Sequence, residues 1–318
     1  MTTTKRAFFE SASDSLIALL GLNRPIRLYR AFLARINCIK RVRVNGTDVS
    51  FDANDELHLL RANWLETKEP ETLEWINGFG QGEVFYDVGA NVGVFSLYAS
   101  LHRGCDVYAF EPEAKNYSCL NKNIFLNRLG RRVIALNVGL HDATSIEFLQ
   151  LHDLASGAAL HSVGEAIDWR GERFEAKFEQ AVLAFRLDEM IELFRMPQPI
   201  HMKIDVDGNE LKVIRGAART LSDPRFRSLQ IELKEGDRDL IQAIESCGLK
   251  LFRLHPCRPA RRASGLLECR IHPRLIFSIA SGPLYHRTQP LPVAAVTRHP
   301  VTRDLLRRSP ASPVRCRS

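Results

Sequence analysis

The chain has 318 residues, of which 45% are hydrophobic and 25% are charged, and this composition is typical of an ordinary globular protein. It excludes a wholly disordered, collagen-like or coiled-coil chain. Of the formal net charge of +7, residues 255–318 contribute +10, so residues 1–254 carry −3. The basicity belongs to a terminal segment, which disfavours a nucleic-acid-binding face on the folded body.

The seven cysteines are an odd number, widely spread, and no two of them form a Cys-x-x-Cys pair. This pattern indicates neither a disulfide framework nor a zinc site and favours a reducing compartment. The apolar stretch at 16–22 is far shorter than the ~20 residues of a membrane helix. Charged residues also interrupt the pattern of a signal peptide. We therefore predict a cytoplasmic protein with no membrane span.

The elements expected before residue 84 are helices and one hairpin. Residues 8–37 alternate apolar and polar positions at helical spacing, which predicts one or two amphipathic helices. Residues 41–51 predict a β-hairpin, because the Asn-Gly pair at 45–46 readily supplies the two positive φ angles of its turn. A helix is expected at about 70–77. Residues 1–83 are thus predicted to be a helical and hairpin extension.

From residue 84 onward, short apolar runs alternate with glycine loops and helical segments. Strands are expected at 84–88, 106–110, 133–138, 200–204 and 228–233, and helices at 95–101, 116–127 and 211–221. This alternation predicts a mostly parallel sheet with helices on both faces. The fold class is therefore a doubly wound α/β domain over residues 84–254, and ligands are expected at the carboxyl ends of its strands.

Two segments interrupt or follow this pattern. Residues 149–177 are polar with little periodicity, which predicts a loop or lid that shapes the acceptor pocket. Residues 255–318 are rich in proline and arginine, which predicts a largely disordered tail. The apolar piece at 275–280 could still dock on the domain. The change of composition also leaves open whether the C-terminal strands are complete and whether the tail is a frame-shift product.

The strongest motif lies where the first strand turns into a helix, at Asp87-Val-Gly-Ala-Asn-Val-Gly93. Its glycines let a ligand approach the backbone, and the N–H groups of the helix start can hold a carboxylate. A dinucleotide fingerprint needs Gly-x-Gly-x-x-Gly, which is absent. Asp87 would repel a pyrophosphate but attract the ammonium and sulfonium groups of S-adenosylmethionine. We therefore predict that this donor is bound by Asp87, Gly89, Ala90, Asn91 and Gly93.

Two further acids follow the second and third strands. Glu111, at the tip of the second strand, is expected to accept hydrogen bonds from both ribose hydroxyls of an adenosine. Asp142 follows the third strand, where the nucleoside base would lie. His141 beside it is either a general base near neutral pH or a solvated loop histidine.

Three acids lie at the end of the fourth strand, at Asp205, Asp207 and Glu210. Asp207 or Glu210 can simply cap the helix that follows. Asp205 ends the apolar run itself and is the better catalytic candidate. Asp205 and Asp207 could together hold Mg²⁺, but without a spaced third ligand we predict no metal site.

Taken together, these motifs resemble the FkbM family of class I methyltransferases. The resemblance runs from about residue 68 to 253 and rests on 87–93, 110–112, the segment at Asp142, 186–189 and 203–208. It implies a Rossmann-like sheet, S-adenosylmethionine as donor, and O-methylation of a sugar or natural-product hydroxyl. By motif, Asp87 would hold the methionine part, Glu111 the ribose and Asp142 the adenine edge, with Asp205 near the reacting centre. Asp207 stands where the family usually has glutamate.

Three other functions are weighed against this one. A nicotinamide-dependent oxidoreductase is disfavoured by the missing third glycine and by Asp87. A donor-binding protein without transfer activity stays open. Specific nucleic-acid recognition by the arginine tail is disfavoured because the tail lacks interleaved aromatic residues. The acceptor, a small molecule or glycan with a free hydroxyl, and the oligomeric state are left open.

Overall fold

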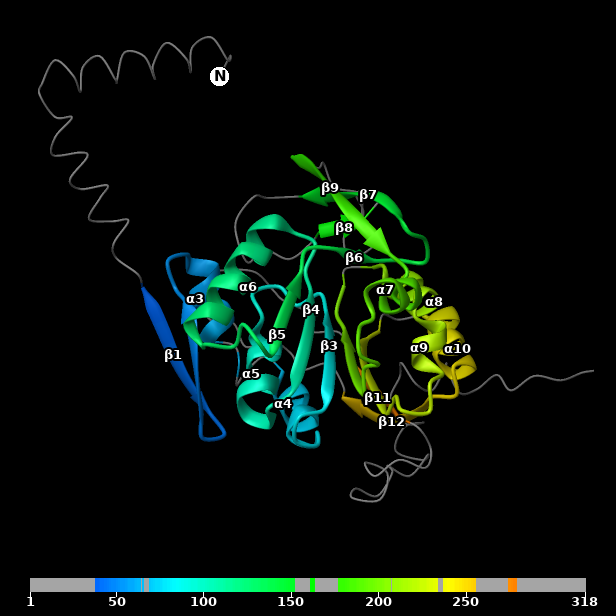
Figure 1. Cartoon of the computed structure of the whole chain (residues 1–318), viewed down its shortest axis with the longest axis horizontal. Helices are drawn as coiled ribbons and strands as arrows, with labels where there is room; N and C mark the ends of the chain where they lie inside the picture. Colours follow the sequence, from blue (N-terminus) through cyan, green and yellow to red (C-terminus); the bar gives the residue numbers. More distant parts are fainter. Residues whose placement is uncertain are drawn as a thin grey trace, which may run out of the picture.

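The central feature of the protein, seen in the computed structural model, is one seven-stranded sheet with helices on both sides (Figure 1). The structure describes residues 38–63, 65, 69–151, 161–163, 177–206, 208–233, 237–255 and 274–278. The helices predicted within 8–37 and the side chain of Asp207 lie outside these residues. Among the described residues, no helix is long and apolar enough to cross a membrane.

The strand order of this sheet is β12-β13-β11-β10-β3-β4-β5. Its strands are β3 (Val84–Val88), β4 (Asp106–Phe110), β5 (Val133–Leu136), β10 (His201–Ile204), β11 (Ser228–Glu232), β12 (Lys250–His255) and β13 (Arg274–Ser278). The five strands from β11 to β5 are parallel, as the sequence predicts. The chain runs from β3 toward β5 and returns at β10, on the other side of β3. The switch point between β3 and β10 is where doubly wound sheets bind ligands.

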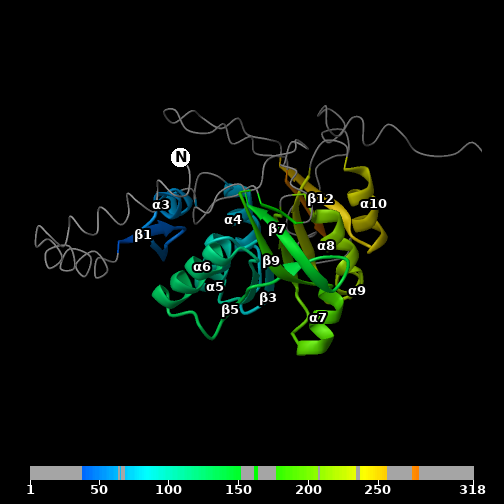
Figure 2. The ribbon, with the colours of Figure 1, turned by 90° about the horizontal axis from the view of Figure 1, so that it is seen from above.

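Successive side chains of each strand point to opposite faces and contribute to two separate cores. Phe85 belongs to the core with the first helical layer, and Tyr86 belongs to the core with the second. The first layer holds α4 (Pro70–Asn77), α5 (Val94–Arg103) and α6 (Ala114–Leu126), and the second holds α7 (Leu187–Phe194), α8 (Glu210–Gly216), α9 (Ala218–Leu221) and α10 (Arg238–Ser246). Figure 2 shows α5 and α6 on one side of the sheet and α8 and α10 on the other.

The N-terminal extension contains the predicted hairpin, β1 (Ile39–Val44) and β2 (Thr47–Asp52), followed by α3 (Glu56–Asn63). Asn45 and Gly46 have φ angles of 47° and 78°, as the predicted turn requires. Two asparagines hold β2 in place: Asn123 lies within α6, and Asn127 is the residue that follows it. Asp52 N donates to Asn123 Oδ1 at 2.7 Å, and Ser50 N donates to Asn127 Oδ1 at 2.9 Å. This docking carries α3 to the edge of the candidate site.

A second sheet lies between β5 and β10 in the sequence, in the order β6-β9-β7-β8. Its strands are β6 (Gly139–Leu140), β7 (Ser145–Leu151), β8 (His161–Val163) and β9 (Phe178–Phe185). The strand predicted at 133–138 is therefore too long, because β5 ends at Leu136. The segment 149–177, predicted to be a loop or lid, contains the end of β7 and all of β8. β6 and β8, with two and three residues, are too short to show a period in the sequence. Residues 152–160 and 164–176 lie outside the described part of the chain.

Part of the predicted tail belongs to the main sheet. β13 pairs antiparallel with both β11 and β12, and its residues Ile276 and Phe277 are buried. The docking considered for the apolar piece at 275–280 is therefore confirmed for residues 275–278. The sheet extends past the boundary predicted at residue 254. The helix predicted at 211–221 is also divided, because Ala217 separates α8 from α9.

Candidate functional site

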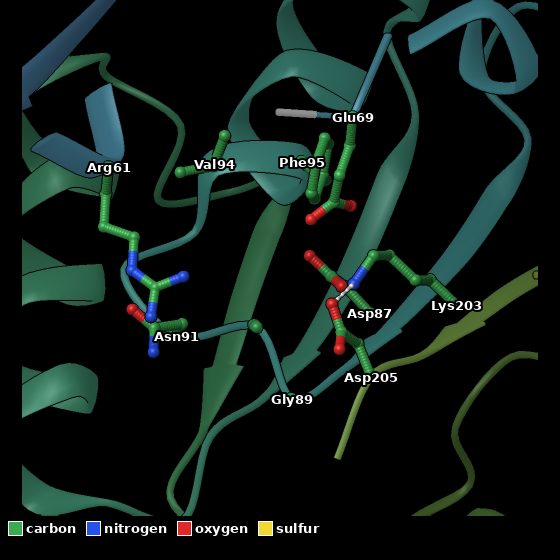
Figure 3. A pocket seen from close by; sticks show the side chains of 10 residues that line it. Arg61, Glu69, Asp87, Gly89, Asn91, Val94, Phe95, Lys203 and Asp205 are labelled. Atoms are coloured by element: carbon green, nitrogen blue, oxygen red, sulfur yellow. Dashed lines mark hydrogen bonds and ion pairs between the residues drawn. The ribbon is translucent and has the colours of Figure 1, made fainter. Parts of the chain in front are cut away.

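A pocket opens at the carboxyl ends of β3 and β10, at the switch point of the sheet (Figure 3). Its walls come from α3, the residue before α4, the loop from β3 to α5, and the end of β10. The residues that line it are Arg61, Glu69, Asp87, Gly89, Ala90, Asn91, Val94, Phe95, Lys203 and Asp205. The structure thus brings most of the predicted glycine-loop residues together with the acid predicted at the end of the fourth strand.

The glycine loop has a backbone that only a few residue types adopt. Gly89, Asn91 and Gly93 have φ angles of 79°, 52° and 87°, values in the left-handed region that favours glycine. A Cβ atom on residue 89 would overlap the backbone carbonyl oxygen of Asp205. The N–H groups of Gly89 and Ala90 both donate to the carbonyl oxygen of Phe110 at 3.0 Å. The loop is therefore held tightly between β4 and β10.

Glu111 fixes the same loop from the end of β4. Its Oε2 accepts from the backbone N–H of Asn91 at 2.7 Å, and its Oε1 accepts from that of Glu113 at 2.9 Å. Burial raises the pKa of Glu111 to about 7, although these hydrogen bonds oppose the shift. Glu111 is 5% exposed and is not among the residues that line the pocket. In the structure it shapes the loop, and its contact with a ribose stays a prediction.

Asp87 is the most deeply buried acid of the pocket, with only 1% of its surface exposed. Its Oδ2 accepts from the hydroxyl of Ser96 at 2.6 Å, whereas its Oδ1 has no hydrogen-bond partner. Burial raises the pKa of Asp87, and the charge of Lys203 and the bond from Ser96 oppose this. A buried acceptor without a donor costs about 1–3 kcal/mol. The pocket therefore suits a ligand that brings a hydrogen-bond donor, and above all a cation, to Oδ1.

Lys203 is a site residue that the sequence analysis missed. It is 2% exposed, its Nζ lies 2.6 Å from Asp205 Oδ2, and the same Nζ lies 5.2 Å from the ring centroid of Phe95. The sequence does signal Lys203, because it is a charged residue within the apolar run that forms β10. A buried charge there needs an ion-pair partner or a functional role. The ion pair orients the partly exposed carboxylate of Asp205 at the pocket (Figure 3).

His141 and Asp142, the histidine and the acid that follow β6, lie outside this pocket. His141 is 8% exposed, its backbone N–H donates to Phe185 at 2.9 Å, and its Nδ1 lies 3.0 Å from Asp142 Oδ1. The backbone carbonyl of Asp142 accepts from Arg186 at 2.7 Å. Neither His141 nor Asp142 is among the residues that line the pocket. The structure thus does not place the two predicted catalytic residues, His141 and Asp205, in one pocket.

The pocket fits the amino-acid end of S-adenosylmethionine. That end carries an ammonium group, and the buried Oδ1 of Asp87 lacks the donor that such a group provides. The absence of a side chain at Gly89 keeps the loop against β10. The described residues contain no group of three or more histidines, cysteines or acids that could hold a metal ion.

Residues 87–251 match the family described as "Methyltransferase FkbM domain". The chain belongs to the FkbM methyltransferase family. This membership confirms the resemblance found in the sequence and the expected cofactor, S-adenosylmethionine. The match begins at Asp87, so the FkbM domain leaves out the hairpin, α3 and α4 as well as β13.

Two curated FkbM relatives have names that describe their reactions. The hexuronic acid methyltransferase AglP of Haloferax volcanii is 24% identical over 169 residues, which cover 53% of this chain and 64% of AglP. The 31-O-demethyl-FK506 methyltransferase FkbM of Streptomyces tacrolimicus is 27% identical over 182 residues, which cover 51% of this chain and 70% of that protein. Among solved structures, Aeropyrum pernix fibrillarin is 13% identical at a TM-score of 0.41, covering 76% of this chain and 84% of fibrillarin.

Proposed function

We propose that this FkbM-family protein transfers a methyl group from S-adenosylmethionine to a hydroxyl group of a sugar, glycan or natural product. One observation carries the proposal most directly: Asp87, a buried acid with one carboxylate oxygen that has no hydrogen-bond partner, lines a pocket at the switch point of the sheet. The names of the two relatives support an acceptor of this class.

The chain would hold the donor along the ends of the parallel strands. Asp87 and Gly89 would hold its ammonium end, Glu111 the ribose and Asp142 the adenine edge, with Ala90, Asn91 and Gly93 forming the wall. When bound, S-adenosylmethionine supplies an electrophilic methyl group on a positively charged sulfur. The chain's main contribution would be to align the acceptor oxygen and exclude water, which can supply up to about 7–11 kcal/mol of the barrier.

Asp205 is our candidate for the group that accepts the hydroxyl proton as the oxygen gains the methyl group. Its carboxylate lines the pocket and is held by Lys203 at 2.6 Å. His141 stays a second candidate, because histidine is the side chain most often used as a general base near neutral pH.

We place the enzyme in the cytoplasm, since the four described cysteines, Cys38, Cys105, Cys119 and Cys247, are free thiols.

The first test is calorimetric titration of the full chain with S-adenosylhomocysteine. We expect binding in the wild type and a loss of affinity of about tenfold or more in Asp87→Asn, because a charged hydrogen bond is lost. Glu192→Gln, an exposed acid on α7, serves as the matched control. A folded wild type that does not bind S-adenosylhomocysteine would refute the donor assignment.

Transfer of a labelled methyl group to a panel of uronic acids, glycans and polyketides then tests the acceptor. A chain that binds the donor product but labels no acceptor would support the donor-binding protein without transfer activity. With a labelled acceptor in hand, Asp205→Asn and His141→Ala are compared in single turnover. The variant that lowers the transfer rate without changing donor affinity identifies the base, and unchanged rates in both would rule out either residue.

A further inference from the structure

Two charged side chains reach the pocket from the N-terminal extension, outside the residues of the family match. Arg61 lies on α3, and Glu69 is the residue that precedes α4. Both line the pocket together with the glycine loop. In Figure 3 the Glu69 carboxylate points toward Asp87, whereas the Arg61 guanidinium lies beside Asn91. The pocket therefore has a negative side and a positive side.

The negative side holds the carboxylates of Glu69, Asp87 and Asp205 and one cation, Lys203, which pairs with Asp205 at 2.6 Å. Glu69 and Asp87 are the two carboxylates on this side that lie outside that ion pair. Glu69 is 3% exposed, and its position is fixed because its Oε2 accepts from the hydroxyl of Thr72 at 3.2 Å. Its backbone carbonyl also accepts from the N–H groups of Thr72 and Leu73, which begin α4. The second, independent observation is the buried Oδ1 of Asp87, which has no hydrogen-bond partner. Two carboxylates facing one space favour a ligand cation there.

The positive side is formed by Arg61 and the start of α5. A guanidinium group matches the two oxygens of a carboxylate in a planar, bidentate arrangement. Val94 and Phe95, the first residues of α5, line the pocket as well. The N-terminus of a ten-residue helix such as α5 favours a negative group through its N–H groups and dipole. An anion is therefore expected on this side.

We propose that Arg61 and Glu69 recognise the zwitterionic amino-acid end of the methyl donor. Arg61 binds its carboxylate, and Glu69 binds its ammonium group together with Asp87. This inference rests on the proposed function and deepens it. The extension upstream of the family match is thus part of the donor site, and the FkbM domain alone would lack half of the groups that bind the amino acid.

Titration of the full chain with three ligands distinguishes recognition of the ammonium group from recognition of the carboxylate. S-adenosylhomocysteine carries both the ammonium and the carboxylate, decarboxylated S-adenosylhomocysteine keeps only the ammonium, and 5′-methylthioadenosine carries neither. Glu69→Gln should weaken the first two ligands about tenfold or more and leave the third unchanged. Arg61→Gln should weaken S-adenosylhomocysteine alone by a similar factor.

Matched controls come from the same part of the chain. Glu74→Gln on α4 and Arg43→Gln on β1 change side chains that are 63% and 71% exposed and that do not line the pocket. Both should leave all three affinities unchanged. The proposal is overturned if Glu69→Gln or Arg61→Gln leaves S-adenosylhomocysteine binding intact, or weakens all three ligands equally, as a purely structural role would.

The wild type alone provides a test that does not depend on the folding of any variant. It should bind S-adenosylhomocysteine more tightly than the decarboxylated ligand, and the decarboxylated ligand more tightly than 5′-methylthioadenosine. Equal affinities for the three would overturn the recognition of the amino-acid end while leaving the donor assignment in place. Absence of binding by all three would instead refute the proposed function.

Discussion

Gly89 packs directly against the backbone carbonyl of Asp205, so that the loop after β3 and the end of β10 meet without a side chain between them. Asp205 N also donates to the carbonyl of Val88 at 3.0 Å. This contact joins the two strands on either side of the switch point and sets the width of the pocket between them.

Gly89→Ala should therefore destabilise the protein and abolish donor binding together. The new Cβ would overlap the Asp205 carbonyl oxygen, and residue 89 must keep a φ of 79°. We expect a loss of more than about 2 kcal/mol in the free energy of unfolding, because steric overlap adds to the backbone strain. The control is Gly46→Ala, with a φ of 78° and nothing within 4 Å of the added Cβ. Urea denaturation of both variants checks this, and equal losses would contradict it.

The raised pKa of Asp87 predicts how donor binding depends on pH. Burial keeps the pKa of this carboxyl above its usual value, and a ligand ammonium favours the ionised form. Binding must then release a proton wherever the free protein holds one, so affinity should fall as pH falls through the raised pKa. Titration of S-adenosylhomocysteine between pH 5 and 8, in buffers of different ionisation enthalpy, measures the proton release. Asp87→Asn should show less proton release, and an unchanged profile would contradict the prediction.

The raised pKa of Glu111 predicts that the stability contributed by this carboxyl falls as pH rises. An acid with a lowered pKa in the folded state would instead lose stability as pH falls. Burial raises its pKa from 4.5 to about 7, so between these values the folded protein holds a proton that the unfolded chain releases. The free energy of unfolding contributed by this group is present below pH 4.5 and declines as pH rises to about 7.

Glu111→Gln removes this titration while keeping the side-chain shape. Relative to the wild type, the variant should gain about 2 kcal/mol in the free energy of unfolding between pH 5 and pH 8. Urea denaturation at both pH values measures the change, with Glu113→Gln as the neighbouring control. Parallel pH profiles of wild type and Glu111→Gln would show that Glu111 is not protonated in the folded protein.

Local sequence signals were sufficient for the hairpin and for the five parallel strands of the main sheet, but not for β12 and β13. The Asn-Gly pair at 45–46 determines its own turn, and each parallel strand is an apolar run that is bounded by a loop. The two shortest strands of the second sheet, β6 and β8, could not be predicted in this way. β6 has two residues and pairs with β9 through Gly139 and Ala184, which are far apart in the sequence. Such short strands are selected by tertiary contacts rather than by their own pattern.

The same distinction applies to the candidate site. Asp87, Gly89 and Asp205 were predicted because the ends of parallel strands meet at one edge of the sheet. Arg61 and Glu69 were not predicted, because their approach depends on how the hairpin and α3 dock. That docking uses hydrogen bonds such as those from β2 to Asn123 and Asn127, which no sequence period reveals.

A buried chain of hydrogen bonds at the opposite edge of the sheet should make the stability of the fold sensitive to acid. Trp75 Nε1 donates to Ser228 Oγ at 2.9 Å, Ser228 Oγ lies 2.7 Å from His201 Nδ1, and His201 Nε2 lies 2.9 Å from Glu83 Oε2. Burial lowers the pKa of His201, although Glu83 opposes this. Burial also opposes ionisation of Glu83, but the bonds from His201 and Gly80 and the charge of Arg227 outweigh it, and its pKa falls to about 2.

The folded state therefore binds fewer protons than the unfolded state at both groups, and stability from them should fall as pH drops below about 6.5 and again below 4.5. Ser228→Ala leaves the buried Nε1 of Trp75 and the Nδ1 of His201 without this hydrogen-bond partner. It should cost about 1–3 kcal/mol in the free energy of unfolding. Ser246→Ala, whose hydroxyl is exposed on α10, is the control. Equal stability of the two variants would show that the chain contributes nothing.

The last strand of the sheet should be indispensable although it lies in the basic tail. Phe277 is fully buried in the second core and pairs with Leu229 of β11. Phe277→Ala should cost about 3–5 kcal/mol because it removes a large buried ring and leaves a cavity. The loss should appear in thermal and urea unfolding of the full chain, with Phe125→Ala as the control, since that ring is 79% exposed. If Phe277→Ala were no more destabilising than Phe125→Ala, β13 would contribute nothing to the core, and the sheet would end at β11, because β12 joins it through β13.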